Sequence, residues 1–390
     1  MLSQEQNTFL RILSDYLQGR KTATDITASI NTDILRQLSV DQQTEAIVYY
    51  QTHIQSLKPS FLSNTYFAVN RRKLLEQIRD VFCKAQIPYL IFKGTEISCY
   101  YPNPEFRKMG DVDILVHAED KEKAEGELLK LGFRENAEKK AQDLEWVFYK
   151  NDFEIELHHQ LLYNADFNEA QHIAFCDRAW EYATLEDGIQ YHLKPEFHFV
   201  FLILHLRKHF LWAGVGIRQF MDLAVMMKNA DLDWNKVEKY LIDLELLPFA
   251  QKCFALIERW FEITPPIASE QITDEFYSSV TQTILSDGVF GRRDEESMEN
   301  NKVLNTTRKH GKILPMLSVI FPPYSQMKEK YPKMGRYPVL LPVMWIRRMI
   351  ESVVFKRAGA SMSYATKHLA MNDEMKARNE MLKSLGLLKN

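Results

Sequence analysis

Apolar positions recur at helical spacing through the first 84 residues. Phe9, Leu10, Leu13 and Leu17 follow the three-to-four-residue repeat of one helix face. The same repeat appears in two later segments, and the three predicted helices cover residues 3–18, residues 41–57, and residues from about 60 to about 84. The pattern therefore predicts an N-terminal helical segment, residues 1–84.

The periodicity changes at Ile87-Pro88. Residues 89–92 (YLIF) form a short continuous apolar run before Lys-Gly-Thr, which is typical of a buried strand entering a tight turn. Residues 111–116 alternate as a strand does, and a hairpin is predicted where residues 146–150 and 153–158 flank Asn-Asp. Helices are expected over residues 95–101 and 119–131, the second one ending at a glycine. Residues 85–160 are thus predicted to form a small α/β unit with a mixed sheet.

From about residue 161 the pattern is helical to the end of the chain. The predicted helices include residues 195–211, 214–228 and 234–246, followed by a break at Thr264-Pro265-Pro266, and residues 291–302 read as a polar loop. The predicted class is α+β. A small mixed-sheet core is embedded between the N-terminal helical segment and a large C-terminal all-helical region, residues 161–390.

Charge is distributed unevenly along a chain that is nearly neutral overall. The 390 residues are enough for two or three domains, and the formal net charge is −3. Residues 302–390, however, carry 17 Lys and Arg against 5 Asp and Glu. This surplus favours an anionic partner on the C-terminal helices, such as a nucleic acid, an acidic glycan or a membrane surface. A set of solvated helices explains the same surplus.

Cysteine usage and hydropathy bear on the cellular location. The four cysteines are widely separated, which argues against a disulfide framework or a zinc cluster and favours a reducing cytoplasm. Residues 1–20 lack the pattern of a signal peptide. The most apolar window, residues 337–346, is far shorter than the roughly 20 residues of a spanning helix. It is either a surface-seeking patch or part of the helical core, and no transmembrane segment is expected.

Acidic residues gather on two of the predicted strands. Strand alternation places Asp111 and Asp113 on one face of the first strand. It places Glu154, Glu156 and His158 together on one face of the second strand. Carboxylates that converge from two strands repel one another unless a cation lies between them. The sequence therefore predicts a divalent-metal site with oxygen ligands.

These residues, in their order and spacing, resemble a known family. The matching pieces are Lys93-Gly94, Arg107-Lys-Met-Gly-Asp111-Val-Asp113, Glu156-Leu157-His158, His205-Leu-Arg-Lys-His209 and Gly216-Ile-Arg218-Gln-Phe-Met-Asp222. Together they are similar to the uncharacterised bacterial nucleotidyltransferase family of the DNA polymerase β-like superfamily. The resemblance covers roughly residues 85–230.

The resemblance implies a role for each matching residue. Asp111, Asp113 and Glu156 would be the catalytic carboxylates and would hold Mg²⁺ or Mn²⁺. The nucleotide-binding residues would be Lys93, Gly94, Thr95 and Arg107, with the glycine turn on the phosphates and the two cations neutralising charge on the phosphates and pyrophosphate. Thr95 stands where the superfamily more often has Ser, and the stretch from Gly94 to Asp111 is longer than usual.

Several of these residues have a plainer interpretation. Glu154 could simply face solvent, and Arg107 could pair with Asp111. His158 could support the carboxylates or merely end a strand. The remaining candidates face a substrate or make structural contacts: His205 and His209, which have zinc-protease spacing without the glutamate of that motif, and Arg218 and Asp222, which are spaced as a helical ion pair.

The leading functional hypothesis is metal-dependent transfer of a nucleoside monophosphate from an NTP to an unidentified acceptor, with release of pyrophosphate. A metal-dependent glycosyltransferase could also use the Asp-x-Asp pair, but it would need a larger nucleotide-binding sheet before Asp111 and leaves Glu156 without a role. A third hypothesis is a non-catalytic anion-binding module that uses the basic C-terminal helices. Neither the acceptor nor the nucleotide base is indicated by the sequence.

Overall fold

The structure is a computed structural model that divides into two compact units. It describes residues 1–23, 25–136, 146–162, 169–212, 214–289, 341–345, 347 and 373–388. The first unit comprises Met1–Phe210 and Gly214–Gly291, and the second comprises Leu211–Ala213 and Arg292–Asn390. In the second unit the described part includes helix α19 (Asp373–Ser384). The predicted polar loop at 291–302 and most of the apolar window at 337–346 lie outside the described residues.

The first unit begins with four helices, α1 (Gln4–Leu17), α2 (Thr32–Asp41), α3 (Glu45–Thr52) and α4 (Lys58–Lys84). Ser3 starts α1 with a capping box, in which its hydroxyl accepts from the backbone of Gln6 and the Gln6 side chain accepts in return. The helical character predicted for residues 1–84 is confirmed. The second predicted helix is wrong in detail, because α2 ends at Asp41 and α3 starts only at Glu45.

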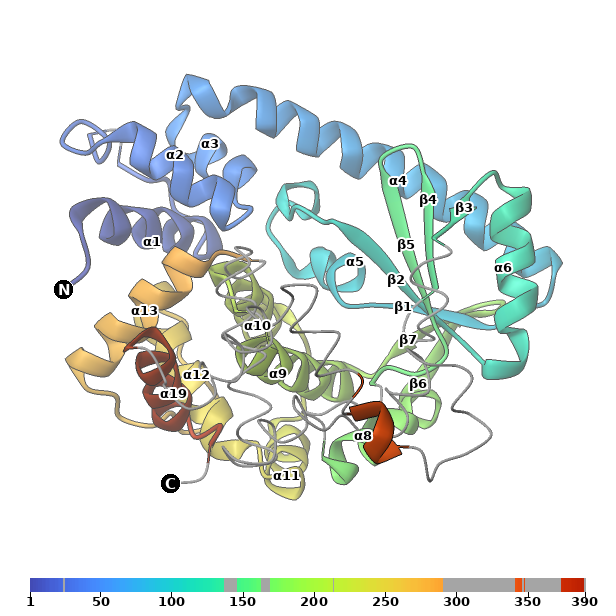
Figure 1. Ribbon diagram of the computed structural model, residues 1–390. Helices are drawn as coiled ribbons and strands as arrows, with labels where there is room; N and C mark the ends of the chain where they lie inside the picture. The colour runs from blue at the N-terminus through green and yellow to red at the C-terminus, as the bar shows by residue number, and fades with distance from the viewer. Residues whose placement is uncertain are drawn as a thin grey trace. The chain divides into compact units, whose positions relative to one another are not determined.

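A seven-stranded mixed sheet forms the centre of this unit (Figure 1). Its strands are β1 (Tyr89–Phe92), β2 (Asp111–Val116), β3 (Arg134–Glu135), β4 (Trp146–Lys150), β5 (Phe153–His158), β6 (Ala183–Asp187) and β7 (Gln190–Leu193). They lie in the order β3-β4-β5-β2-β1-β7-β6. β2 is antiparallel to β1 and parallel to β5, so it occupies the middle of the sheet.

Strands β6 and β7 correct the expectation that the chain is helical throughout after residue 161. β7 pairs in parallel with β1, so the sheet extends beyond the predicted range of residues 85–160. β6 is largely exposed at the sheet edge and therefore carries no apolar periodicity. Its formation depends on backbone pairing with β7 across a turn at Gly188, whose φ of +60° suits glycine.

One face of the sheet packs on α4 and α6 (Lys121–Lys130). Val112, Ile114, Ile155 and Leu157 point to this face and are all nearly or fully buried. Three side chains of α4 cover them, namely Leu74, Ile78 and Phe82. The alternation that sends these apolar residues to α4 sends their polar neighbours to the other face.

Helix α9 (Pro195–Trp212) packs on that other face at the end of β1. The rings of Phe92 and Phe201 meet edge to face with centroids 5.8 Å apart. The other α-helices in the described part of this unit are α5 (Gly94–Ile97), α8 (Ala170–Asp177), α10 (Ile217–Asn229), α11 (Trp234–Asp243), α12 (Leu247–Phe261) and α13 (Asp274–Asp287). The α+β class with flanking helical regions is thereby confirmed. None of the described helices combines the length and apolar character needed to cross a bilayer.

Candidate active site

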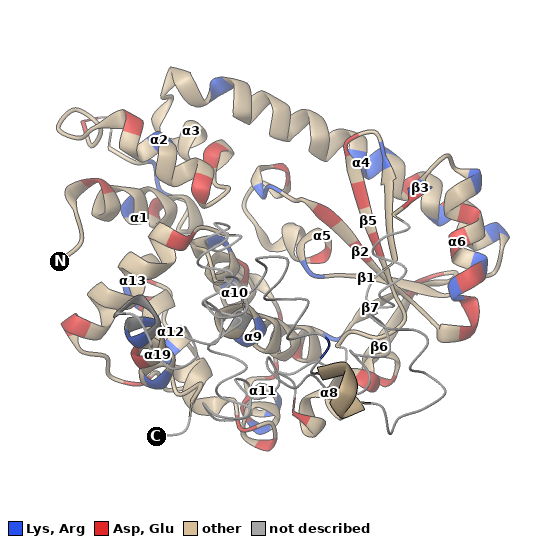
Figure 2. Ribbon diagram, in the orientation of Figure 1, with Lys and Arg blue, Asp and Glu red and all other residues tan. Residues whose placement is uncertain are grey.

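The acidic residues of β2 and β5 lie side by side because the two strands are parallel neighbours. Their register pairs Asp111 with Glu154 and Asp113 with Glu156. Paired residues on adjacent strands present their side chains to the same face of a sheet. The acidic stretches of both strands are therefore adjacent, as Figure 2 shows. The predicted convergence of carboxylates from two strands is observed.

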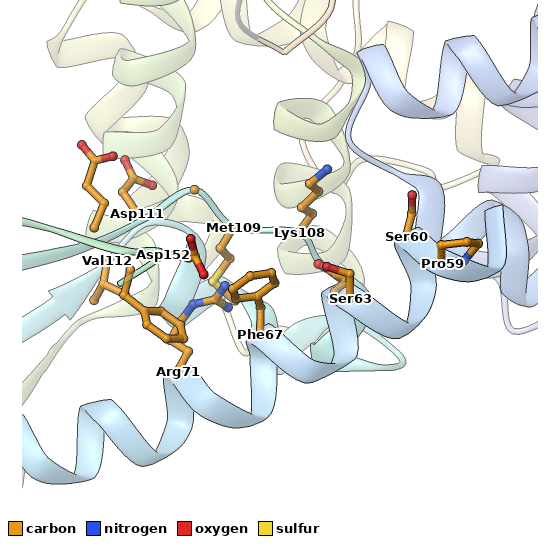
Figure 3. A pocket seen from close by; sticks show the side chains of 14 residues that line it. Pro59, Ser60, Ser63, Phe67, Arg71, Lys108, Met109, Asp111, Val112 and Asp152 are labelled. Atoms are coloured by element: carbon orange, nitrogen blue, oxygen red, sulfur yellow. The ribbon is translucent and has the colours of Figure 1, made fainter. Parts of the chain in front are cut away.

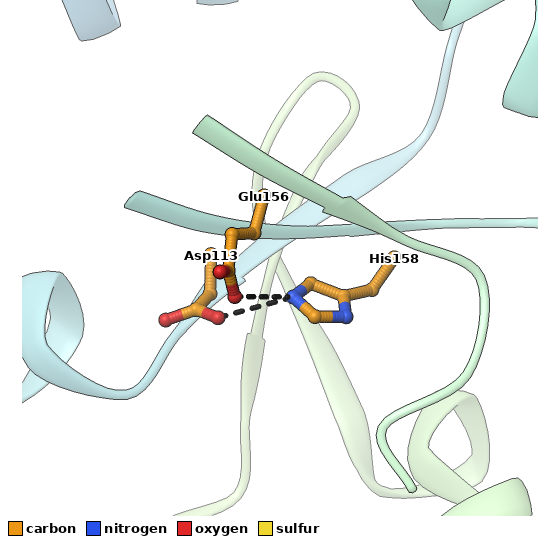
Figure 4. Close-up of side chains that lie close together, drawn as sticks. All are labelled: Asp113, Glu156 and His158. Atoms are coloured by element: carbon orange, nitrogen blue, oxygen red, sulfur yellow. Dashed lines mark hydrogen bonds and ion pairs between the residues drawn. The ribbon is translucent and has the colours of Figure 1, made fainter. Parts of the chain in front are cut away.

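Asp113, Glu156 and His158 form the tightest part of this cluster (Figure 4). The Nε2 atom of His158 lies 3.1 Å from Oδ1 of Asp113 and 3.5 Å from Oε2 of Glu156. One potential ligand atom from each residue falls within 4.8 Å of the other two. The two carboxylates offer the oxygen ligands that a divalent cation of the Mg²⁺ or Mn²⁺ type prefers, and His158 is hydrogen-bonded to Asp113 beside them. Asp111 lies two residues before Asp113 on β2, and its carboxylate is not one of these three potential ligands.

Lys93 supplies the positive charge nearest to Asp113. Its Nζ atom is 2.5 Å from Oδ1 of Asp113, and Asp113 itself is only 3% exposed. Burial alone would raise the pKa of Asp113, but Lys93 and His158 more than offset this and lower it to about 2. Burial and repulsion by Asp113 raise the pKa of Asp111 to about 6. Burial opposes protonation of His158, whereas its hydrogen bond to Asp113 raises its pKa overall.

The turn after β1 positions Lys93. Its backbone has φ +54° and ψ −134°, a conformation that L-residues rarely adopt. The Lys93 amide donates to Nε2 of the buried His198 on α9 at 3.0 Å, so that imidazole must be unprotonated at Nε2. This bond holds the strained backbone in place. Nothing in the sequence singled out His198, since a histidine within an apolar helix is usually a core residue.

Gly94 follows Lys93 and lies against the guanidinium of Arg107. A Cβ at position 94 would be 2.3 Å from Nη1 of Arg107, so only glycine allows this approach. Thr95, the next residue, directs its hydroxyl to the sulfur of Met109 at 3.5 Å. The predicted glycine turn thus lies at the end of β1, beside the acidic strand.

Arg107 is paired with Asp222 of α10. Its Nε and Nη2 atoms donate to the two carboxylate oxygens at 2.8 and 2.7 Å, and Tyr101 donates its hydroxyl to the same carboxylate at 2.7 Å. All three side chains are buried. The alternative that Arg107 pairs with Asp111 is therefore wrong. The bidentate ion pair holds Arg107 beneath the turn.

The other predicted site residues form no hydrogen bond or ion pair with the acidic cluster, although the charge of Arg218 acts on Asp111. Arg218 does not pair with Asp222, because its Nη1 atom donates to Oε1 of Gln43 and to the carbonyl of Lys108, both at 2.5 Å. His205 and His209 meet through their Nε2 atoms at 2.8 Å. Burial lowers the pKa of His209 to about 3 and that of His205 well below its usual value. These two imidazoles form a neutral hydrogen-bonded pair.

Sequence reasoning also missed Arg71 of α4. This residue is 8% exposed and occupies the same helix face as Leu74 and Ile78. A cation within an apolar stripe was the signal that could have found it, because a buried arginine normally needs a partner.

The fold and this cluster define an α+β protein with a candidate divalent-cation site beside a glycine turn. A family model described as an uncharacterised nucleotidyltransferase matches residues 35–262, which is more than half of the chain, and the chain belongs to this family. Comparisons with curated proteins and with solved structures found no match. The bacterial source and the DNA polymerase β-like superfamily stay predictions.

Proposed function

We propose that the protein transfers a nucleoside monophosphate from an NTP to a hydroxyl or phosphate of an acceptor and releases pyrophosphate. The observation that supports this most directly is the pairing of Asp113 with Glu156 on adjacent parallel strands, with His158 against both carboxylates. Family membership supports a transferase acting on nucleotides. The acidic cluster supports a metal-dependent reaction.

Three carboxylates would hold the divalent cations, those of Asp111, Asp113 and Glu156. When bound, such ions neutralise phosphate charge and lower the pKa of an attacking hydroxyl. His158 keeps Asp113 oriented through its 3.1 Å hydrogen bond. The ammonium of Lys93 lies in the same cluster and can offset charge on the phosphates from there.

The phosphates are proposed to bind at Gly94 and Thr95, at the end of β1 beside the acids. Arg107 has a different proposed role from the one the resemblance implied. Its guanidinium is committed to Asp222 and lies directly under Gly94. We therefore assign Arg107 to holding the shape of the turn instead of to direct contact with phosphate.

The glycosyltransferase alternative receives no support from the topology. It needs a larger nucleotide-binding sheet before the Asp-x-Asp pair, whereas in the described part of the chain β1 alone precedes β2. It also gives no reason for Glu156 to lie beside Asp113. The anion-binding alternative depends on residues 302–390, most of which lie outside the described residues.

The experiment is to measure binding of each of the four NTPs with and without Mg²⁺ or Mn²⁺. Pyrophosphate release is then followed in the presence of a metabolite extract. Asp113→Asn should abolish metal-dependent binding and lower turnover by about 100-fold or more, because a cation ligand is lost. Asp80→Asn is the matched control, since it removes one carboxylate from the exposed side of α4. Unchanged binding and turnover in Asp113→Asn would falsify the proposal.

A further inference from the structure

A cavity lies at the start of β2 and β5, and of the acidic residues on these two strands it is lined by Asp111 and Glu154. Its volume is about 580 Å³, within the range of small-molecule sites. Phe67 and Arg71 of α4 line it on one side, and Met109, Asp111 and Phe153 line it on the other. Asp111 therefore belongs both to the acidic strand and to the cavity wall. Figure 3 shows Phe67 and Arg71 projecting from α4 toward the loop that carries Met109.

Arg71 is the unusual member of this lining. Its side chain is more than nine-tenths buried, yet it makes no hydrogen bond or ion pair with any residue that the structure describes. Burial and the nearby Arg107 lower its pKa to about 10, so it still carries a positive charge at neutral pH. The charge of Asp111 favours the protonated guanidinium without forming an ion pair with it, and the guanidinium nitrogens keep access to solvent, so they can bind an anionic group of a ligand.

The other residues that line the cavity indicate which chemical group the ligand carries besides its anion. The rings of Phe67 and Phe153 meet edge to face with centroids 5.9 Å apart, and they present apolar surface beside Arg71. Lys108 also lines the cavity, but its ammonium is paired with Glu45 at 2.7 Å. The acids Asp111, Asp152 and Glu154 line the cavity as well and would repel an anion, which leaves the guanidinium of Arg71 as its binding point.

The cavity and the glycine turn lie on opposite sides of the acidic strand. The turn follows β1, which pairs with one edge of β2, whereas the cavity includes Phe153 and Glu154 of β5, which pairs with the other edge. Met109 separates the two, because it contacts the Thr95 hydroxyl and also lines the cavity. In phosphoryl-type transfer the attacking and leaving oxygens lie roughly in line on opposite sides of phosphorus. If the phosphates bind at the turn, the cavity at the other edge of β2 is available to the acceptor.

We propose that this cavity binds the acceptor, and that the acceptor is a small molecule with a carboxylate or phosphate held by Arg71 and a planar apolar part against Phe67 and Phe153. This inference rests on the proposed function. The acceptor hydroxyl oxygen forms a bond to the α-phosphorus, the bond from that phosphorus to the bridging oxygen of pyrophosphate breaks, and the hydroxyl proton passes to water.

The test uses benzoate and phenyl phosphate as probes, with benzyl alcohol as the neutral control. Binding to the full chain is measured by isothermal titration calorimetry without nucleotide or divalent metal. Arg71→Met should weaken binding of at least one anionic probe by about tenfold or more, because the charge-assisted pair is lost. Arg71→Lys keeps the charge without the planar fork and should give an intermediate loss. Arg72→Met changes the exposed neighbour on the same helix and should match the wild type.

The outcomes separate this inference from the proposed function. If neither anionic probe binds, if benzyl alcohol binds equally well, or if Arg71→Met binds as the wild type does, the acceptor assignment is overturned. If Arg71→Met instead weakens metal-dependent NTP binding as strongly as probe binding, the cavity belongs to the nucleotide and the assignment also fails. The Asp113→Asn experiment is unaffected by these results. Circular dichroism confirms folding of each variant, and Arg71→Lys carries the test should Arg71→Met not fold.

Discussion

At the scale of single residues, the partner of each charged side chain decides its role. Arg107 reads as a phosphate ligand from its position in the sequence, but two hydrogen bonds commit it to Asp222. Lys93 lies instead against Asp113 within the acidic cluster. Asp222 is more than 100 positions from Arg107 in the chain, so no local sequence pattern could have shown that these two side chains form an ion pair.

Gly94→Ala should destabilise the protein by about 1–3 kcal/mol. The added methyl group would lie 2.3 Å from Nη1 of Arg107, and the ion pair with Asp222 prevents that guanidinium from moving away freely. Urea unfolding measures the change. Gly126→Ala on α6 should have the opposite sign and stabilise by about 0.5–1 kcal/mol, because a Cβ there meets no atom within 4 Å. Equal effects of the two substitutions would contradict this account of the turn.

Asp222→Asn should lower the free energy of unfolding by about 3–5 kcal/mol. The substitution leaves the charge of Arg107 buried with only neutral partners, which is the costly way to break an internal ion pair. Asp187→Asn is the control, because the pair of Asp187 with Arg79 is exposed and should contribute less than about 1 kcal/mol. Chemical denaturation of both variants provides the comparison, and a loss below 1 kcal/mol for Asp222→Asn would show that the buried pair is dispensable.

At the scale of elements, helices and strands with a clear apolar periodicity were predictable from the sequence. Strands that form only by pairing with segments far away in the sequence were not. The bounds of β1, β2, β4 and β5 agree with the sequence prediction, because each strand carries a distinct apolar run or alternation next to a turn. β6 escaped prediction because an exposed edge strand has no such pattern, and β7 escaped it because its four residues are too few for a clear apolar run or alternation and it forms by pairing with the distant β1. The acidic face was predictable for the same reason as its strands, whereas the cavity was not, since α4 meets β5 only in the folded chain.

Helix α9 should make the protein sensitive to mild acid. His209 has a folded pKa of about 3, and His198 one of about 4, against 6.5 in the unfolded chain. Below pH 6.5 the unfolded chain takes up these protons and the folded protein does not. The contribution of these two histidines to stability is therefore lost as the pH falls from about 6.5 toward 4, by at most about 1.4 kcal/mol per pH unit for each, and the raised pKa of Asp111 offsets part of this below pH 6.

The measurement is urea unfolding at several pH values between 7.5 and 5. His209→Gln removes one of these groups, so its unfolding free energy should fall less steeply with decreasing pH than that of the wild type. Parallel curves for the two proteins would show that His209 is already protonated in the folded state.

At the scale of the whole molecule, binding should be visible as stabilisation. A ligand present at 100 times its dissociation constant stabilises the folded state by about 2.7 kcal/mol. An NTP with Mg²⁺ should therefore raise the melting temperature, and chelation by EDTA should reverse most of the shift because the carboxylates would again repel the phosphates. Asp113→Asn should show little shift under any of these conditions. A shift of equal size with and without EDTA would argue against a metal-dependent site.

The basic residues between positions 302 and 390 leave a separate prediction. Binding to DNA, RNA or anionic vesicles, if this surplus of charge serves a partner, should be strongest at low salt and fall as salt rises. Absence of binding at low salt would favour a set of solvated helices. The division into domains at residues 84 and 160 and the cytoplasmic location are also predictions that the fold leaves open.

The parallel pairing of β2 with β5 has a consequence for how the protein is made. Parallel neighbours cannot be joined by a tight turn, and Asp113 and His158 are 45 positions apart in the chain. The intervening connection, which contains α6 and the strands β3 and β4, must close before the carboxylates come together, and closures of this length are slow steps in folding. Nucleotide affinity would therefore emerge late during refolding, which makes the time course of its recovery a readout for completion of the sheet.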